Sequence, residues 1–111
     1  MEFINSGKEK NTTTIALKGK MDAVTAPKFD SGLGALMEQG ETSFILDMGG
    51  LEYISSAGLR SILAAGKKLK GSGGRLMIAS LGGTVKEVFE ISGFDALFPV
   101  FGSVADALAS I

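Results

Sequence analysis

The sequence has no cysteine, no histidine and no tryptophan among its 111 residues. Without cysteine the chain can form no disulfide, no thiolate nucleophile and no cysteine-based metal site. Without histidine it lacks imidazole metal ligands and the usual general base near neutral pH, which excludes Ser-His-Asp and Cys-His catalysis. We therefore expect a protein that is not an enzyme and that binds no metal or cofactor.

An excess of one charge and a long apolar run are also missing. Lys and Arg number 11, Asp and Glu number 12, and the net charge is −1. This balance argues against direct binding to nucleic acid or to anionic lipid. Residues 1–14 are polar and lack the apolar segment of a signal peptide, and no run reaches the ~18 apolar residues of a membrane span. We expect a cytoplasmic protein that does not contact the membrane.

The composition is that of a folded domain, with 45% apolar and 21% charged residues. A chain of this length buries roughly two-thirds of its unfolded surface, which is enough to form a stable core without disulfide bonds or a structural metal. We therefore interpret residues 1–111 as one domain. No heptad pattern is present, and a monomer is expected.

Hydrophobic spacing predicts the element order β-β-α-β-α-β-α-(β)-α. Phe29, Leu33 and Met37 share one helical stripe, whereas Phe44 to Leu46 form the unbroken apolar run of a parallel strand. The expected elements are a hairpin turn at 8–13, a strand at 14–19, a helix from the N-cap Thr25 to Gly40, a strand at 43–48, a loop at 51–54, a helix at 55–70, a strand at 75–79, a helix at 82–93, an edge segment at 97–101 and a helix at 103–111. Alternating strands and helices predict a small α/β fold with a mixed, mostly parallel sheet of four to five strands and about four helices.

The segment 47–60 leads from the carboxyl end of a buried strand into a helix, which is where ligands and partners bind in open α/β sheets. Ser55 and Ser56 stand at the helix start, where an N-cap and an N1 residue would satisfy free amides. No histidine can activate either hydroxyl, so the functional alternative is a serine that receives a phosphoryl group. Some of the apolar residues Tyr53, Ile54 and Leu59 are expected at the surface beside them.

Two charged features have an ordinary and a functional interpretation. Asp22 and Asp47 follow strands and could meet as a carboxylate pair near Ser56, or could serve separately as turn and cap residues. Lys67, Lys68 and Lys70 end the second helix. There the helix dipole favours cations, and solvated capping explains them better than a phosphate or RNA site.

Three stretches of the chain together resemble STAS-domain anti-sigma factor antagonists. They are Leu46–Met48 with Leu51–Arg60, Leu17–Asp22, and Gly74–Leu76 leading to Val85–Gly93. The resemblance covers nearly the whole chain in order and implies a STAS fold. In the family, the unphosphorylated protein binds an anti-sigma factor, usually a serine kinase of the histidine-kinase-like ATPase type, and frees the sigma factor. Phosphorylation of one serine abolishes that binding, and a serine phosphatase restores it.

The resemblance places the phosphoacceptor at Ser56. Many members have Asp before the acceptor and Ser or Thr after it, where this chain has Ser55 and Ala57, so Ser55 is the alternative acceptor. The expected partner-binding residues are Asp22, Tyr53, Ile54, Ser55, Gly58, Leu59 and Arg60.

Two other classes of function stay open. One is a STAS scaffold or regulatory subunit of a membrane transport or lipid-trafficking complex. The other is a small-molecule or nucleotide-binding sensor, or an enzyme that uses carboxylates.

Overall fold

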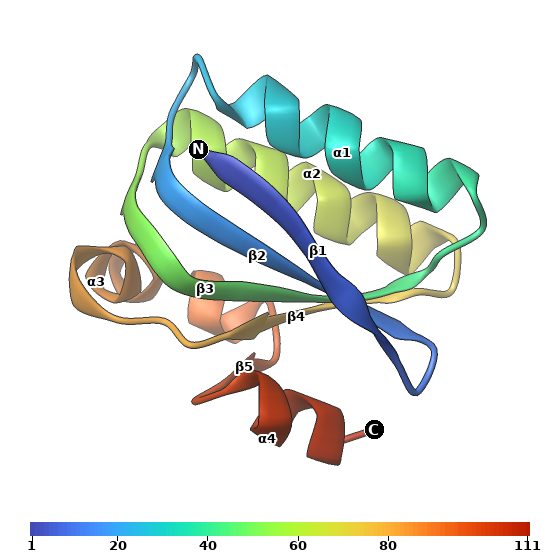
Figure 1. Ribbon diagram of the computed structural model, residues 1–111. Coiled ribbons are helices and arrows are strands. Elements are labelled where there is room, and N and C mark those ends of the chain that lie inside the picture. Colours follow the sequence, from blue (N-terminus) through green and yellow to red (C-terminus); the bar gives the residue numbers. More distant parts are fainter.

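The computed structural model describes all residues from Met1 to Ile111 as one five-stranded sheet with four α-helices (Figure 1). The elements are β1 Glu2–Glu9, β2 Thr12–Met21, α1 Ala26–Glu38, β3 Ser43–Ile54, α2 Ser56–Gly71, β4 Arg75–Ala79, α3 Gly83–Ile91, the 3-10 helix η1 Phe94–Ala96, β5 Val100–Phe101 and α4 Val104–Ala109. The strand order is β1-β2-β3-β4-β5; β1 is antiparallel to β2, and all other neighbours are parallel. The predicted fold class is confirmed.

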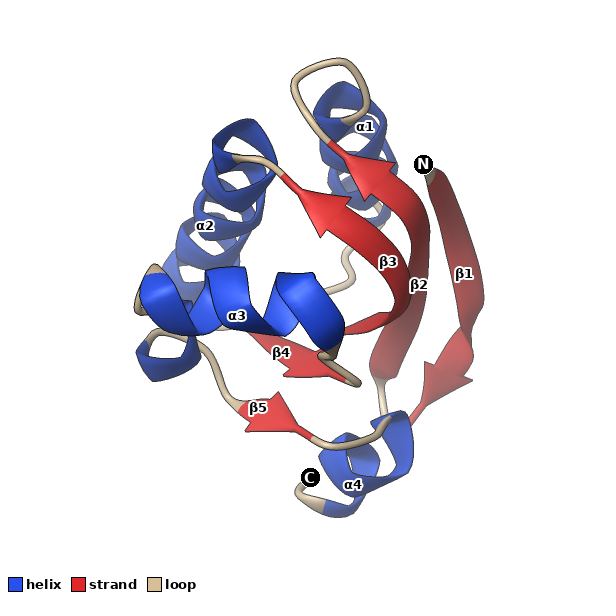
Figure 2. Ribbon diagram, turned by 90° about the vertical axis from the view of Figure 1, so that its left-hand side faces the viewer, coloured by secondary structure: helices blue, strands red, loops and turns tan.

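Helices α1 and α2 lie side by side on one face of the sheet, and the short α4 lies on the other (Figures 1 and 2). The main core lies beneath α1 and α2 and contains the fully buried Phe29, Phe44 and Phe89. Each such side chain stabilises the fold by roughly 1.5–3 kcal/mol. A smaller cluster around Ile45 and Ala107 joins α4 to the sheet. The predicted helical stripe at Phe29 and Leu33 is therefore the buried face of α1.

The first hairpin is tighter than the sequence pattern predicts. The turn consists of Lys10 and Asn11 alone, not of residues 8–13. Both residues have positive φ, 52° and 58°, as the central pair of a type I′ hairpin requires. Asparagine tolerates this conformation, and Lys10 adopts it because the paired strands impose it. The strands are consequently longer than expected, and β2 spans Thr12–Met21.

Strand β3 is also longer than predicted, and this correction shapes the functional end of the molecule. The pattern at Asp47, Gly49 and Gly50 predicts the end of the strand there, with a loop at 51–54. Instead β3 continues to Ile54, because β2 runs beside it and pairs Met21 with Ile54. The glycines fall where the pairing register shifts, so they mark a β-bulge rather than a strand end.

Candidate functional site

The start of α2 is tied to the carboxyl ends of two parallel strands. Ile54 ends β3, and the backbone N–H of Ser55 donates to the carbonyl oxygen of Met21 at 2.9 Å. The Ser55 hydroxyl oxygen accepts from the backbone N–H of Gly58 at 3.2 Å. With φ −91° and ψ 173°, Ser55 is an N-cap in extended conformation. Its half-buried hydroxyl is thus engaged in holding the first turn of α2.

Ser56, the first residue of α2, has an exposed side chain whose hydroxyl makes no hydrogen bond within the chain. It stands beside the unpaired amides of the helix start, the positive end of the helix dipole. A negative charge placed there is stabilised by about 0.3–1 kcal/mol. The two serines therefore have different roles: Ser55 caps the helix, and Ser56 is accessible from solvent.

Two residues expected on a partner surface are buried, and for these the prediction is corrected. Ile54 is only 4% exposed because alternation along β3 turns it toward the core. Gly58 is buried as well, and a Cβ there would stand 2.8 Å from Ile54 Cγ1, 3.0 Å from Met21 Cγ and 3.1 Å from the Met21 carbonyl oxygen. These two residues bring α2 close to the sheet instead of facing a partner.

The turn between β2 and α1 is organised by Asp22. Its carboxylate accepts from the backbone N–H of Val24 at 2.9 Å and of Thr25 at 3.0 Å. The Thr25 amide is the largest cause that holds the pKa of Asp22 below its ordinary value. Thr25 occupies the predicted N-cap position of α1, but its hydroxyl donates to the Lys20 carbonyl at 2.9 Å and does not cap the helix.

Of the two interpretations of Asp22 and Asp47, the structure contradicts the carboxylate pair and agrees with two separate turn residues. Asp47 lies in the middle of the sheet, between Ala16 of β2 and Ala79 of β4. From Ala16, β2 runs five further positions to Met21 before Asp22 follows it, which sets the two backbones roughly 17 Å apart at the rise of an extended strand. The Asp47 carboxylate instead accepts from the backbone N–H of Gly49 at 3.1 Å, so it stabilises the bulge in β3.

Apolar side chains are exposed at the end of the sheet where Ser56 lies. Tyr53 is 48% exposed, as predicted, and Val24 is 86% exposed at the tip of the Asp22 turn. Leu59 is half-buried against the core, and Arg60 is exposed. We call Val24, Tyr53, Ser56 and Arg60 the Ser56 surface. Sequence reasoning did not find Val24; the signal would have been an apolar residue inside an Asp-x-x-Thr turn.

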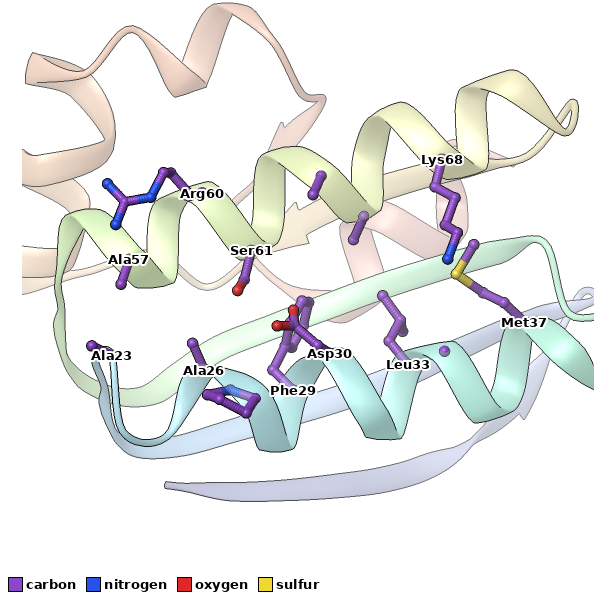
Figure 3. Close-up of a pocket in the computed structure, with 14 residues that line it drawn as sticks. Ala23, Ala26, Phe29, Asp30, Leu33, Met37, Ala57, Arg60, Ser61 and Lys68 are labelled. Atoms are coloured by element: carbon purple, nitrogen blue, oxygen red, sulfur yellow. The ribbon is translucent and has the colours of Figure 1, made fainter.

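A groove of about 490 Å³ runs between α1 and α2 away from this end (Figure 3). Ala23, Ala26 and Ala57 leave room at its mouth, and Arg60 and Lys68 reach it from α2. Ser56 does not line it.

No group of three or more acidic side chains gathers anywhere in the chain to hold a metal ion. None of the helices has the length and apolar character needed to cross a bilayer.

Comparison with known proteins gives a consistent result. Residues 4–107 match the STAS domain model. The chain is 43% identical over 94 residues to BtrV of Bordetella bronchiseptica, to which an anti-sigma factor antagonist function is provisionally assigned; the match covers 85% of this chain and 81% of BtrV.

Two solved structures share the fold. An anti-sigma factor antagonist from Mycobacterium paratuberculosis superposes with a TM-score of 0.89 at 23% identity, covering 99% of this chain and 92% of that one. The phosphorylated form of the Bacillus cell fate determinant SpoIIAA superposes with a TM-score of 0.77 at 21% identity, covering 98% of each chain. The family match over nearly all of the sequence, the 43% identity and the five-stranded fold lead to one conclusion: the chain belongs to the STAS domain family.

Proposed function

We propose that this protein is an anti-sigma factor antagonist whose binding to its partner is switched off by phosphorylation of Ser56. The observation that carries the proposal is the contrast between the two serines at the start of α2. Ser56 is exposed and unbonded, whereas Ser55 is half-buried and caps the helix. The name of BtrV and the phosphorylated form of SpoIIAA support it from outside the chain.

The partner in this proposal is an anti-sigma factor that is also a serine kinase of the histidine-kinase-like ATPase type. It transfers the γ-phosphoryl group of ATP to the Ser56 Oγ, releasing ADP and the hydroxyl proton. A serine phosphatase then hydrolyses the phosphoester and restores the hydroxyl. The chain itself contributes the exposed acceptor and the surface around it, and Ser55 is the alternative acceptor.

Phosphorylation acts at the interface in this mechanism, not on the fold. A phosphoserine carries about −1.5 to −2 charges. At the first position of α2 this charge favours the helix by about 0.3–1 kcal/mol, so the helix stays formed. A partner that covers the exposed Val24 and the half-exposed Tyr53 must also desolvate the dianion beside them. Burying an unpaired charge costs several kcal/mol, and every 1.4 kcal/mol weakens binding about tenfold.

The partner surface consists of the accessible residues around Ser56. Val24 and Tyr53 supply apolar contact, and Arg60 supplies a cation on the next turn of α2. Asp22 acts indirectly by holding the turn that presents Val24. Leu59 contributes the part of its side chain that stays accessible.

The test is phosphopeptide mapping of the protein purified from its own cells, together with Ser55→Ala and Ser56→Ala variants. Ser61→Ala, five positions further along α2, is the matched control. We expect phosphate on Ser56, its loss only in Ser56→Ala, and loss of partner binding on phosphorylation with an unchanged circular dichroism spectrum. Phosphate on Ser55 would move the site and keep the function. Absence of phosphate under all growth conditions, or a collapsed spectrum on phosphorylation, would refute the switch.

A further inference from the structure

A second cavity lies far from Ser56, at the opposite end of α2. Its volume is about 410 Å³, and it opens between the last turns of α2, the start of β4 and the segment that joins η1 to β5. Lys70 follows Ser56 by fourteen positions along α2, which is about 21 Å at the rise of an α-helix. We call this cavity the basic pocket and define it by Leu63, Lys67, Lys70, Arg75, Leu97 and Phe98.

The floor of the basic pocket is apolar and firmly held. Phe98 is buried and packs against Phe94, with ring centroids 6.0 Å apart. Gly66 allows the close approach of α2, because a Cβ there would stand 2.4 Å from the Phe98 ring. Leu97 is different, since 58% of its side chain is exposed at the edge of the pocket. An apolar side chain of a partner could therefore dock on Leu97 without any rearrangement of the core.

The rim of the basic pocket carries charges of one sign only. Lys67 and Lys70 stand on α2 and Arg75 on β4, and no carboxylate lines the pocket. None of these three cations forms an ion pair, because the one salt bridge in the molecule joins Lys8 to Glu41. The chain as a whole is nearly neutral, with a net charge of −1, so this rim is a local excess of positive charge.

The last-turn lysines also favour the helix dipole, which explains their presence at the end of α2. The dipole does not explain Arg75, which lies on β4, nor the exposed Leu97 that lines the same pocket. Lys68 also lies in the last turns of α2, where the dipole favours it, but it faces the groove between α1 and α2 and not the basic pocket (Figure 3). A position at the helix end therefore does not by itself place a lysine at the basic pocket. Cations from two elements and an exposed apolar side chain thus surround one cavity.

We propose that the basic pocket binds an acidic segment of a protein partner, with an apolar anchor on Leu97 and carboxylates between Lys67, Lys70 and Arg75. Charge complementarity favours a negatively charged partner segment, and the apolar floor favours a segment with an aliphatic or aromatic side chain. This contact uses no atom of the Ser56 surface, so a partner can occupy it whether or not Ser56 is phosphorylated.

The test is a titration of the isotope-labelled protein, followed by amide chemical shifts, with a capped probe peptide. The probe carries three glutamates on each side of a leucine and a phenylalanine, and the matched peptide carries lysines in place of the glutamates. We expect shifts at Gly66, Lys70, Gly74 and Leu97 with the acidic peptide only. Ser56 and Tyr53 should not shift. Raising the salt concentration should weaken the binding.

Two variants and one matched control separate recognition from helix capping. Lys67→Gln with Lys70→Gln should weaken the probe about fivefold, since exposed ion pairs are individually modest. The control, Lys68→Gln with Lys86→Gln, removes the same charge from residues outside the pocket and should leave the affinity within about twofold. Leu97→Ser should weaken binding about fivefold by removing the apolar anchor, and its melting temperature verifies that it folds.

Three outcomes would overturn the proposal. They are equal weakening in both lysine variants, shifts centred away from the basic pocket, and no saturable binding of the acidic peptide. Binding of anionic vesicles or of single-stranded DNA at these residues, without binding of the peptide, would assign the pocket to another class of ligand. The outcome at Ser56 does not affect this test, since the probe and the variants leave that surface unchanged.

Discussion

Gly58→Ala is the substitution that tests most directly how α2 is placed. The added Cβ would stand 2.8 Å from Ile54 Cγ1 and 3.1 Å from the Met21 carbonyl oxygen. The first contact is shorter than real Cβ contacts, and the second is to backbone, which cannot swing away. The first turn of α2 must therefore lift from the ends of β2 and β3.

The expected magnitude is a balance of two effects. Overpacking a well-filled site costs about 1–3 kcal/mol. Replacing glycine by alanine inside a helix stabilises the helix by about 0.5–1 kcal/mol, because alanine has the higher helix propensity. We expect Gly58→Ala to lower the free energy of unfolding by about 1–2 kcal/mol, or the melting temperature by about 5–10 °C.

Gly34→Ala is the matched control, because it makes the same change in a helix where the site is open. Gly34 lies inside α1, and apart from the backbone of its own helix no atom comes within 4 Å of its added Cβ. Only the propensity effect applies, so this variant should be more stable by about 0.5–1 kcal/mol. The two substitutions are thus expected to have opposite signs.

The assay is urea unfolding of the three proteins, followed by circular dichroism, with the midpoint and slope fitted separately. The reasoning is refuted if Gly58→Ala is as stable as the wild type, or if both variants shift in the same direction. Gly58→Ala should also weaken partner binding, because Ser56 moves with the first turn of α2. A destabilised variant with full partner affinity would separate packing from presentation of the serine.

The other predictions concern the ends of β2 and β3. Ser55→Ala should cost about 1 kcal/mol of stability through loss of the N-cap, whereas Ser56→Ala should stay within about 0.5 kcal/mol of wild type in thermal unfolding. Asp22 has its folded pKa depressed from 3.8 by the Thr25 amide, so its contribution to stability is present above that value and is lost as pH falls through the lower folded pKa. Urea midpoints at pH 7 and pH 3 should show this loss, and Asp22→Asn should reduce it. Val24→Ser and Tyr53→Ala should both weaken binding to the anti-sigma factor, measured by calorimetry. Val24→Ser should leave the melting temperature unchanged because Val24 is 86% exposed, whereas Tyr53→Ala should lower it slightly because about half of Tyr53 is buried.

Local sequence patterns predicted the helices and strands that are specified by residues close together in the chain. The stripe through Phe29 and Leu33 indicated α1, and the apolar run from Phe44 to Leu46 indicated a buried parallel strand; both are confirmed. Ser55 and Ser56 were placed correctly as N-cap and first helical residue. The Ser55 cap and the amphipathic spacing depend on neighbours within a few residues, so they can be recognised without the fold. The predicted Thr25 cap is wrong, because the Thr25 hydroxyl donates to the Lys20 carbonyl of β2 instead.

Tertiary structure decided the features that depend on the neighbouring strand. Gly49 and Gly50 resemble a strand end in isolation, but pairing with β2 carries β3 on to Ile54. That extension turns Ile54 inward, leaves Tyr53 at the surface and separates Asp47 from Asp22. The basic pocket likewise arises where distant segments meet. The sequence by itself determined the element order and the acceptor candidate, because those signals are local. Burial and proximity required the fold, because they are set by the partners a residue meets across the sheet.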